Sequence, residues 1–180
     1  MSHTYSEFLP SYSVGVDCYK VIPEIVKPYG KKAVAVGGKT AMEKSKKALL
    51  EGIKGSDIEI IDFVWYGGDS SYENVEKIKN NPSVQKADMV FGIGGGRAVD
   101  TAKTYCALYN KPLFTFPTIA SNCASCTSLS VMYNPDGTFK EYSYHKAPAI
   151  HTFINTKIIA ESPEKLTWAG IGDALSKKYL

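Results

Sequence analysis

Residues 87–109 read Ala-Asp-Met-Val-Phe-Gly-Ile-Gly-Gly-Gly-Arg-Ala-Val-Asp-Thr-Ala-Lys-Thr-Tyr-Cys-Ala-Leu-Tyr. Residues 89–93 form a short apolar run that is typical of a strand buried on both faces, and three consecutive glycines follow it at once. After the glycines, apolar side chains recur at three- and four-residue spacing, which predicts an amphipathic helix (Val99, Ala102, Cys106 and Tyr109). The stretch therefore predicts a strand, a glycine turn and a helix.

Such a turn is suited to bind a diphosphate. Glycine lets backbone N–H groups approach an anion closely, and the start of a helix carries a partial positive charge. The spacing is not the G-x-G-x-x-G of the dinucleotide fingerprint, because Arg97 stands at the sixth position counted from Gly92. A tight connection without a ligand is the alternative, so nucleotide binding needs support from the neighbouring motifs.

The rest of the chain alternates between the two kinds of element. Apolar runs predict strands at residues 12–16, 32–37, 58–64, 113–116 and 152–155, and helical spacing predicts helices at residues 21–29, 40–53, 70–79 and 163–180. In the first strand Tyr12, Val14 and Val16 alternate with small residues, as in a half-buried strand. This alternation predicts an α/β fold, a Rossmann-like parallel sheet flanked by helices, with ligands at the carboxyl ends of its strands.

Local signals place the helix starts and one inserted element. Thr40 with Glu43, and Ser70 with Glu73, read as capping boxes, and Ser162 reads as an N-cap before a proline. Residues 129–142 predict a β-hairpin inserted after the predicted strand at residues 113–116.

Composition limits the class of protein. The chain has 180 residues, about the length of one domain, with 44% apolar and 22% charged residues. The net charge is +3 with both signs interspersed, so we expect no nucleic-acid and no membrane partner. The N-terminus lacks the pattern of a signal peptide, and we expect a cytoplasmic protein.

The four cysteines are too few for a disulfide scaffold at this length. Cys123 and Cys126 form a single C-x-x-C, which cannot close a zinc site without further ligands. We favour two ordinary small residues in a loop over a redox pair.

Four segments, residues 94–103, 116–121, 129–133 and 169–175, resemble the iron-containing alcohol dehydrogenase superfamily, most closely its glycerol dehydrogenase branch. The resemblance covers only the N-terminal nucleotide-binding domain of that family, and the family's C-terminal all-helical domain is absent here. It implies a dinucleotide-binding domain over residues 1–162 and the first helix of a truncated metal-binding domain over residues 163–180. It also implies oxidation of a small-molecule alcohol or polyol with NAD or NADP and a divalent metal, zinc or iron.

The resemblance carries over residue by residue. Gly94, Gly95, Gly96 and Arg97 match the pyrophosphate site, with Asp100 and Lys103 supporting that loop. Thr118 and Ser121 match the lining of the dinucleotide cleft, and Thr127, Leu129 and Tyr133 match its nicotinamide half. Asp173 matches the family's aspartate metal ligand, although from the residues alone it reads as a solvated helix residue.

Three departures from the family pattern stand out. The histidines (His3, His145 and His151) lie far from the positions of the family's metal-binding histidines, so the metal site is incomplete. Cys123 stands where the glycerol-binding aspartate is expected, which puts glycerol in doubt as a substrate. Gly38, followed by Lys39, replaces the acidic residue that binds the ribose 2′-hydroxyl, so NADP becomes admissible.

The resemblance predicts a fragment or a naturally shortened form of a metal-dependent dehydrogenase, inactive alone and expected to form a homo-oligomer. A non-catalytic nucleotide-binding or assembly protein that associates through residues 163–180 is the main alternative. Phosphorylated substrates, as in glycerol-1-phosphate dehydrogenase and dehydroquinate synthase, rank last, because residues 118–128 supply no basic cluster.

Overall fold

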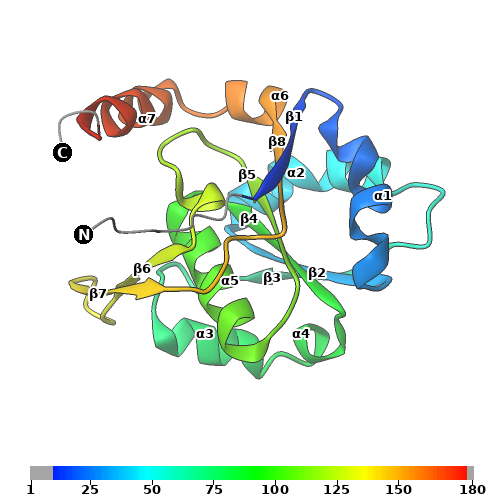
Figure 1. Ribbon diagram of the computed structural model, residues 1–180, viewed down its shortest axis with the longest axis horizontal. Coiled ribbons are helices and arrows are strands. Elements are labelled where there is room, and N and C mark those ends of the chain that lie inside the picture. Colours follow the sequence, from blue (N-terminus) through cyan, green and yellow to red (C-terminus); the bar gives the residue numbers. More distant parts are fainter. Residues whose placement is uncertain (1–9, 178–180) are drawn as a thin grey trace, which may run out of the picture.

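A six-stranded parallel sheet forms the centre of the molecule (Figure 1). The computed structural model describes residues 10–177. The strands are β1 (Ser11–Gly15), β2 (Lys32–Gly37), β3 (Glu59–Trp65), β4 (Met89–Gly94), β5 (Leu113–Pro117) and β8 (His151–Asn155), in the order β1-β8-β5-β4-β2-β3. β2, β4 and β5 are almost completely buried, as their apolar sequences predict.

Helices cover both faces of the sheet and enclose two apolar cores. The helices are α1 (Ile22–Val26), α2 (Lys39–Gly52), α3 (Tyr72–Lys79), α4 (Pro82–Lys86), α5 (Gly96–Tyr109), α6 (Thr156–Ala160) and α7 (Glu164–Ser176). One core contains Ile22 of α1 and Leu49 of α2, and the other contains Ile78 of α3 and Cys106 of α5. The predicted Rossmann-like architecture is confirmed.

The direction of the strand order reverses between β2 and β4. From β2 the chain moves outward to β3, returns past β2 to β4, and then continues in the opposite direction to β5. In open α/β sheets such a switch point leaves a crevice at the carboxyl ends of the two strands. Both strands end in glycines at this point, β2 in Gly37 and β4 in Gly94.

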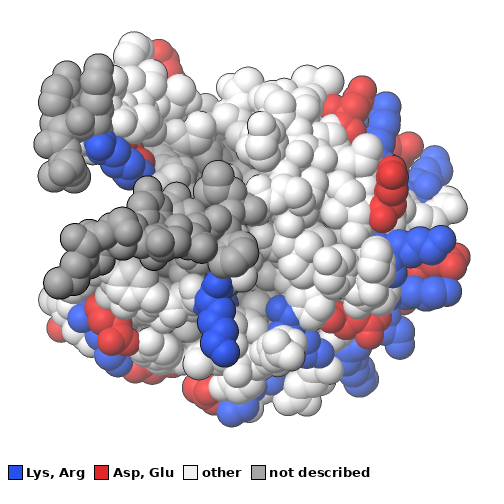
Figure 2. All heavy atoms as spheres, in the orientation of Figure 1, with Lys and Arg blue, Asp and Glu red and all other residues white. Residues whose placement is uncertain are grey.

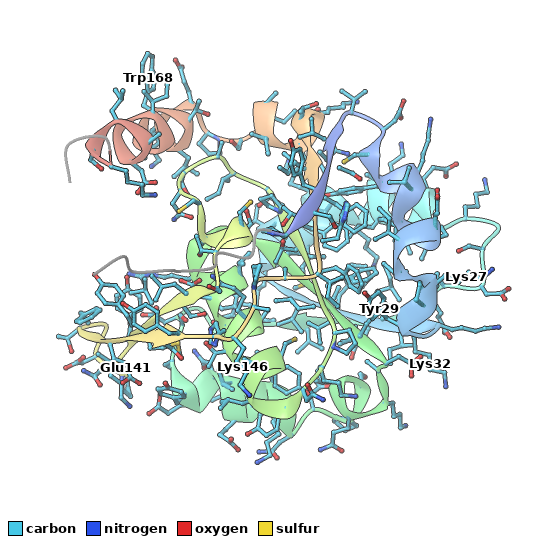
Figure 3. All side chains as sticks on the ribbon, in the orientation of Figure 1. Lys27, Tyr29, Lys32, Glu141, Lys146 and Trp168 are labelled. Atoms are coloured by element: carbon cyan, nitrogen blue, oxygen red, sulfur yellow. The ribbon has the colours of Figure 1, made fainter. Side chains whose placement is uncertain are left out.

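The inserted hairpin and the last helix lie at the periphery. β6 (Leu129–Tyr133) and β7 (Phe139–Tyr144) pair antiparallel, as predicted. α7 lies away from the sheet, and Trp168 projects from it away from the rest of the molecule (Figures 1 and 3). No described residue of α7 is buried.

The burial predicted for the first strand is wrong. β1 forms, but Tyr12, Val14 and Val16 are 68%, 59% and 61% exposed. β1 is an edge strand that pairs with β8, and its serines rather than its apolar residues contact that neighbour: Ser11 and Ser13 lie within hydrogen-bond distance of the two ring nitrogens of His151. Alternation alone could not reveal which side of the strand faces the protein.

The predicted helix caps are displaced. The N-cap of α2 is Gly38 without a side-chain cap, so Thr40 and Glu43 do not form a capping box. The N-cap of α3 is Ser71, one residue after Ser70, and its hydroxyl accepts from the Asn74 N–H. At α7 the N-cap is Pro163, and the buried Ser162 hydroxyl finds no partner among the described residues. α4 and α6 were not predicted, although Asn81 and Asn155 cap them.

Candidate functional site

The glycine turn lies at the switch point of the sheet. Gly94 has φ 139°, a conformation that residues with a Cβ rarely adopt, and α5 begins two residues later at Gly96. A Cβ on Gly96 would lie 2.8 Å from the side-chain nitrogen of Asn122, so the loop over residues 118–122 passes close to the turn. A Cβ on Gly95 would likewise lie 2.5 Å from Ile119 Cδ1, so only glycine lets the side chains of this loop approach the start of α5 so closely.

Two further strand ends adjoin this turn. The Gly38 N–H donates to Ile93 O at 3.3 Å, and the Thr118 N–H donates to Gly94 O at 3.3 Å. The carboxyl ends of β2, β4 and β5 are therefore held together, which brings Gly38 and Thr118 beside the glycines. A Cβ at Gly38 would make ordinary van der Waals contacts, with Ala41 Cβ at 3.7 Å and Tyr66 Cε1 at 3.9 Å.

Arg97 connects the turn to the hairpin and to the loop after β3. Its Nη1 lies 3.4 Å from Asp69 Oδ2, and its guanidinium lies 4.7 Å from the ring centroid of Tyr133. The Tyr133 N–H donates to Ser70 O at 2.8 Å, which holds the backbone of the hairpin beside the loop that carries Asp69. Asp69 was not predicted as a site residue, although Gly67-Gly68-Asp69 after a strand's carboxyl end could have indicated it.

A buried ion pair on α5 holds the segment that covers one side of the site. Lys103 Nζ lies 2.9 Å from Asp100 Oδ1, and both side chains are almost fully buried. The same ammonium donates to carbonyl oxygens of Ala124 (2.7 Å), Thr127 (3.3 Å) and Leu129. The pair therefore anchors the 124–129 segment to α5, rather than supporting the glycine turn itself.

The carboxylate of the pair makes a second attachment. Asp100 Oδ2 accepts from the Val131 N–H at 3.1 Å, and Ser130 Oγ donates to Asp100 O at 3.1 Å. Burial raises the pKa of Asp100 and lowers the pKa of Lys103, and in each case the partner's opposite charge opposes the shift. The positions of Thr127 and Leu129 thus depend on this buried network, in which each polar group has the others as its hydrogen-bond partners.

A small cleft lies between α7 and the 120–123 loop. Its volume is about 420 Å³, and it is lined by Ala120, Asn122, Cys123, Gly170, Asp173, Ala174 and Lys177. Lys177 Nζ lies 2.6 Å from Asp173 Oδ2 and 3.0 Å from Cys123 Sγ, so it joins the two residues that the resemblance singled out. Asn122 lines this cleft and also lies beside the glycine turn, a role that no motif in the sequence indicates.

α7 reaches this loop through a close contact at Gly170. A Cβ at that position would lie only 1.7 Å from Ala120 O and 3.3 Å from Ser121 Cα. Only glycine permits this approach. Ser121 therefore lies beside α7 at Gly170.

The described residues do not complete a metal site. No group of three or more His, Cys, Asp or Glu side chains in residues 10–177 could hold a metal ion. His145 contacts Ser130 and His151 contacts Ser11 and Ser13, whereas His3 lies outside the described residues. One carboxylate and one thiol beside an ammonium are too few ligands for a catalytic metal.

Two surface features do not add to the site. A larger cavity of about 690 Å³ lies at the opposite end of α5, beside Lys111, His145 and Lys146, and includes none of the glycine-turn residues. On the face drawn in Figure 2, acidic and basic side chains are interspersed. Over the described part of the chain, no helix combines the length and apolar character that crossing a bilayer requires.

The switch point, the glycine turn and the flanking helices define a Rossmann-like α/β domain. Comparison with known proteins makes this assignment specific. A model of the family described as iron-containing alcohol dehydrogenase matches residues 10–154, and the chain belongs to that family.

Curated relatives and solved structures agree with the family. Glycerol dehydrogenase of Thermotoga maritima is 32% identical over 174 residues, which cover 96% of this chain and 47% of the relative. Glycerol dehydrogenase of Escherichia coli O6:H1 is 30% identical over 165 residues, which cover 92% of this chain and 45% of that relative. The crystal structure of glycerol dehydrogenase from Schizosaccharomyces pombe superimposes with a TM-score of 0.85 at 30% identity, covering 97% of this chain and 44% of that one. The chain thus spans about half the length of these relatives and corresponds to their N-terminal part.

Proposed function

We propose that this chain is the N-terminal NAD(P)-binding domain of a metal-dependent alcohol dehydrogenase that acts on a glycerol-type polyol or another small alcohol. The observation that carries the proposal is the glycine turn at the switch point, where the first amides of α5 meet the ends of three strands. A diphosphate is favoured there, because the turn carries no side chains of its own and the start of α5 favours an anion.

Each expected cofactor residue has a place in this proposal. Gly94, Gly95, Gly96 and Arg97 hold the diphosphate, and Gly38 with Lys39 faces the adenosine ribose. Thr118 and Ser121 line the middle of the cleft, and Thr127, Leu129 and Tyr133 line its nicotinamide half. When bound, the nicotinamide would supply the hydride acceptor or donor for alcohol oxidation or aldehyde reduction. No carboxylate stands at Gly38 to repel a 2′-phosphate, and the adjacent Lys39, whose ammonium lies 4.6 Å from the Trp65 ring centroid, is a cation, so NADPH and NADH are both candidates.

The substrate side is proposed for the cleft under α7. Cys123 faces the substrate, Asp173 is one ligand of the divalent metal, and residues 163–180 begin the helical metal-binding domain that follows residues 1–162. Because the described residues supply too few metal ligands, we expect no turnover from this chain alone. In the proposal, the other ligands come from polypeptide that corresponds to the second half of the relatives.

The exposed face of α7 favours a second candidate function, a nucleotide-binding or assembly protein. Trp168, Ile171 and Leu175 are 64%, 45% and 58% exposed on this one helix. Such a face would support a homo-oligomer. Light scattering distinguishes the candidates in part, since a strictly monomeric chain at tens of micromolar would remove the assembly function.

Titration with NADH and NADPH, followed by nicotinamide fluorescence, tests the main proposal. We expect saturable binding of at least one nucleotide, and about tenfold weaker binding by Arg97→Gln, which loses a charge-assisted contact to phosphate. Lys86→Gln is the matched control, because Lys86 is an exposed cation at the end of α4, on a different helix from the glycine turn. The absence of saturation with both nucleotides at millimolar concentration, in a folded chain, would overturn nucleotide binding.

A further inference from the structure

The C-x-x-C of this chain lies in an accessible loop beside the candidate site. Cys123 is exposed and Cys126 is partly exposed, whereas Cys18 and Cys106 are buried. Cys123 precedes a short 3-10 helix, Ala124–Cys126, and the Cys126 N–H donates to Cys123 O at 2.9 Å. Both thiols of the pair are therefore reachable by a small solute, and they stand at the two ends of one tight turn.

The turn brings the two cysteines within the reach of a disulfide. A turn closed by a hydrogen bond between residues i and i+3 keeps its end Cα atoms within about 7 Å. Disulfides span Cα separations of about 4.4–6.8 Å, so a bridge needs at most a small adjustment of this loop. The loop lies at the surface rather than in either core, which makes such an adjustment feasible.

An ammonium stands directly at the first sulfur. Lys177 Nζ reaches Cys123 Sγ at 3.0 Å from α7, while also pairing with Asp173. A cation at this distance stabilises negative charge on the sulfur that attacks an oxidant. The sequence alone favours two ordinary cysteines in a loop. It gives no sign of the ammonium, since Lys177 lies 54 positions from Cys123 and no spacing rule joins them.

We propose that Cys123 and Cys126 form a peroxide-sensitive thiol pair, in which Cys123 is the reacting thiol and Cys126 the resolving thiol. The Cys123 thiolate attacks one oxygen of hydrogen peroxide, so that an S–O bond forms and the O–O bond breaks. The departing hydroxide takes up a proton and becomes water. The thiol of Cys126 then attacks the sulfenic sulfur, an S–S bond forms, and the S–O bond breaks, releasing the oxygen with the thiol proton as a second water. The sulfur pair loses two electrons, peroxide gains two, and a dithiol reductant reverses the change.

The other two thiols serve as internal controls. Burial raises the pKa of Cys18 to about 11, and burial also raises the pKa of Cys106. Buried thiols of this kind react slowly with peroxide. The oxidation should therefore be confined to one loop of the chain.

Mass spectrometry of the intact 180-residue chain tests the proposal. After hydrogen peroxide treatment we expect a loss of two hydrogens per chain, and a peptide over residues 123–126 that is alkylated only after reduction. Cys126→Ser should stop at the sulfenic acid, which dimedone traps on Cys123, and Cys123→Ser should show neither product. A wild-type chain that keeps both thiols alkylatable, or that forms its disulfide through Cys18 or Cys106 or between chains, would overturn the proposal.

The role of Lys177 has its own readout. Lys177→Met should slow the reaction of Cys123 with peroxide about threefold to fivefold, the rate equivalent of losing an exposed ion pair. Lys165→Met is the matched control, because Lys165 is an exposed lysine of the same helix. Equal rates in the two variants would remove Lys177 from the proposal. The experiment needs no nucleotide, so its outcome is independent of the proposed dehydrogenase function.

Discussion

α5 and α7 contact the same loop but in opposite ways. Every residue of α5 from 98 to 106 is buried, including Asp100 and Lys103. α7 is nearly as long, yet none of its described residues is buried. α5 holds the loop through a network of buried charges and carbonyl groups, whereas α7 meets it at Gly170 and Lys177.

The difference indicates that the two halves of the proposed site have unequal stability. The cofactor half is built on buried contacts that open only when the domain unfolds, whereas the substrate half depends on a surface helix that can open alone. Preorganised nucleotide binding with a labile substrate side is therefore the expected behaviour of this chain. The following experiments test that inequality.

The largest effect is expected from removing the buried ammonium. Lys103→Met leaves the Asp100 carboxylate buried without its cation and deprives three loop carbonyls of their donor. We expect the free energy of unfolding to fall by about 3–5 kcal/mol, since breaking a buried pair leaves an uncompensated charge. Urea denaturation followed by circular dichroism measures the change.

The double variant Asp100→Asn, Lys103→Met separates charge from packing. With both charges removed, part of the loss should be recovered, because no unpaired ion then remains buried. A loss below about 1 kcal/mol in the single variant would show that α5 does not anchor the loop in the way that the contacts indicate.

A smaller and local effect is expected at the α7 contact. Gly170→Ala places a methyl group where the backbone of Ala120 lies at 1.7 Å, so the helix must move off the loop. Hydrogen exchange of the α7 amides should accelerate, while unfolding of the sheet changes by less than about 1 kcal/mol.

Gly172→Ala is the matched control on the same helix. Nothing lies within 4 Å of a Cβ at Gly172, and alanine favours a helix over glycine by about 0.5–1 kcal/mol. Exchange of the α7 amides should therefore slow. If both variants accelerated exchange equally, the contact between Gly170 and Ala120 would not be the one that holds α7 against the loop.

The same contrast explains what the sequence could predict. The apolar runs of β2, β4 and β5 and the glycine turn gave the sheet and the candidate diphosphate site, because burial on both faces leaves an unambiguous pattern. For the edge strand β1 the predicted burial was wrong, since alternation does not identify the side of a strand that faces the protein. The predicted N-cap positions differ from the observed ones by one or two residues, because capping depends on local geometry that several neighbouring residues can satisfy.

Long-range contacts within the site were not predictable from single motifs. Asp69 meets Arg97 and Asn122 meets Gly96 only because separate strand ends converge at one edge of the sheet. Lys103 was expected to support the glycine turn, yet its ammonium reaches a loop more than 20 positions away. Sequence spacing gives the face of a helix but not the segment that packs against it.

The smallest predicted effect is a pH dependence confined to the anchored part of the molecule. Burial lowers the pKa of His145, and the charge of Lys103 lowers it further; burial also lowers the pKa of His151. Since both pKa values lie below the unfolded value of about 6.5, the unfolded chain binds more protons in mild acid. The stabilising effect is complete above that value and is lost as the pH falls below it.

We therefore expect the free energy of unfolding to decrease from pH 7 to pH 5.5, with a slope below the limit of about 1.4 kcal/mol per pH unit for each histidine. His145→Gln keeps a partner for the Ser130 hydroxyl, which His145 contacts at 2.8 Å, and should reduce the dependence to the part that His151 contributes. α7 contains no histidine, so the opening free energy of its amides, after correction for intrinsic exchange rates, should not follow this pH dependence. A parallel change in both regions would mean that α7 opens only together with the sheet, and the inequality between the two helices would then be wrong.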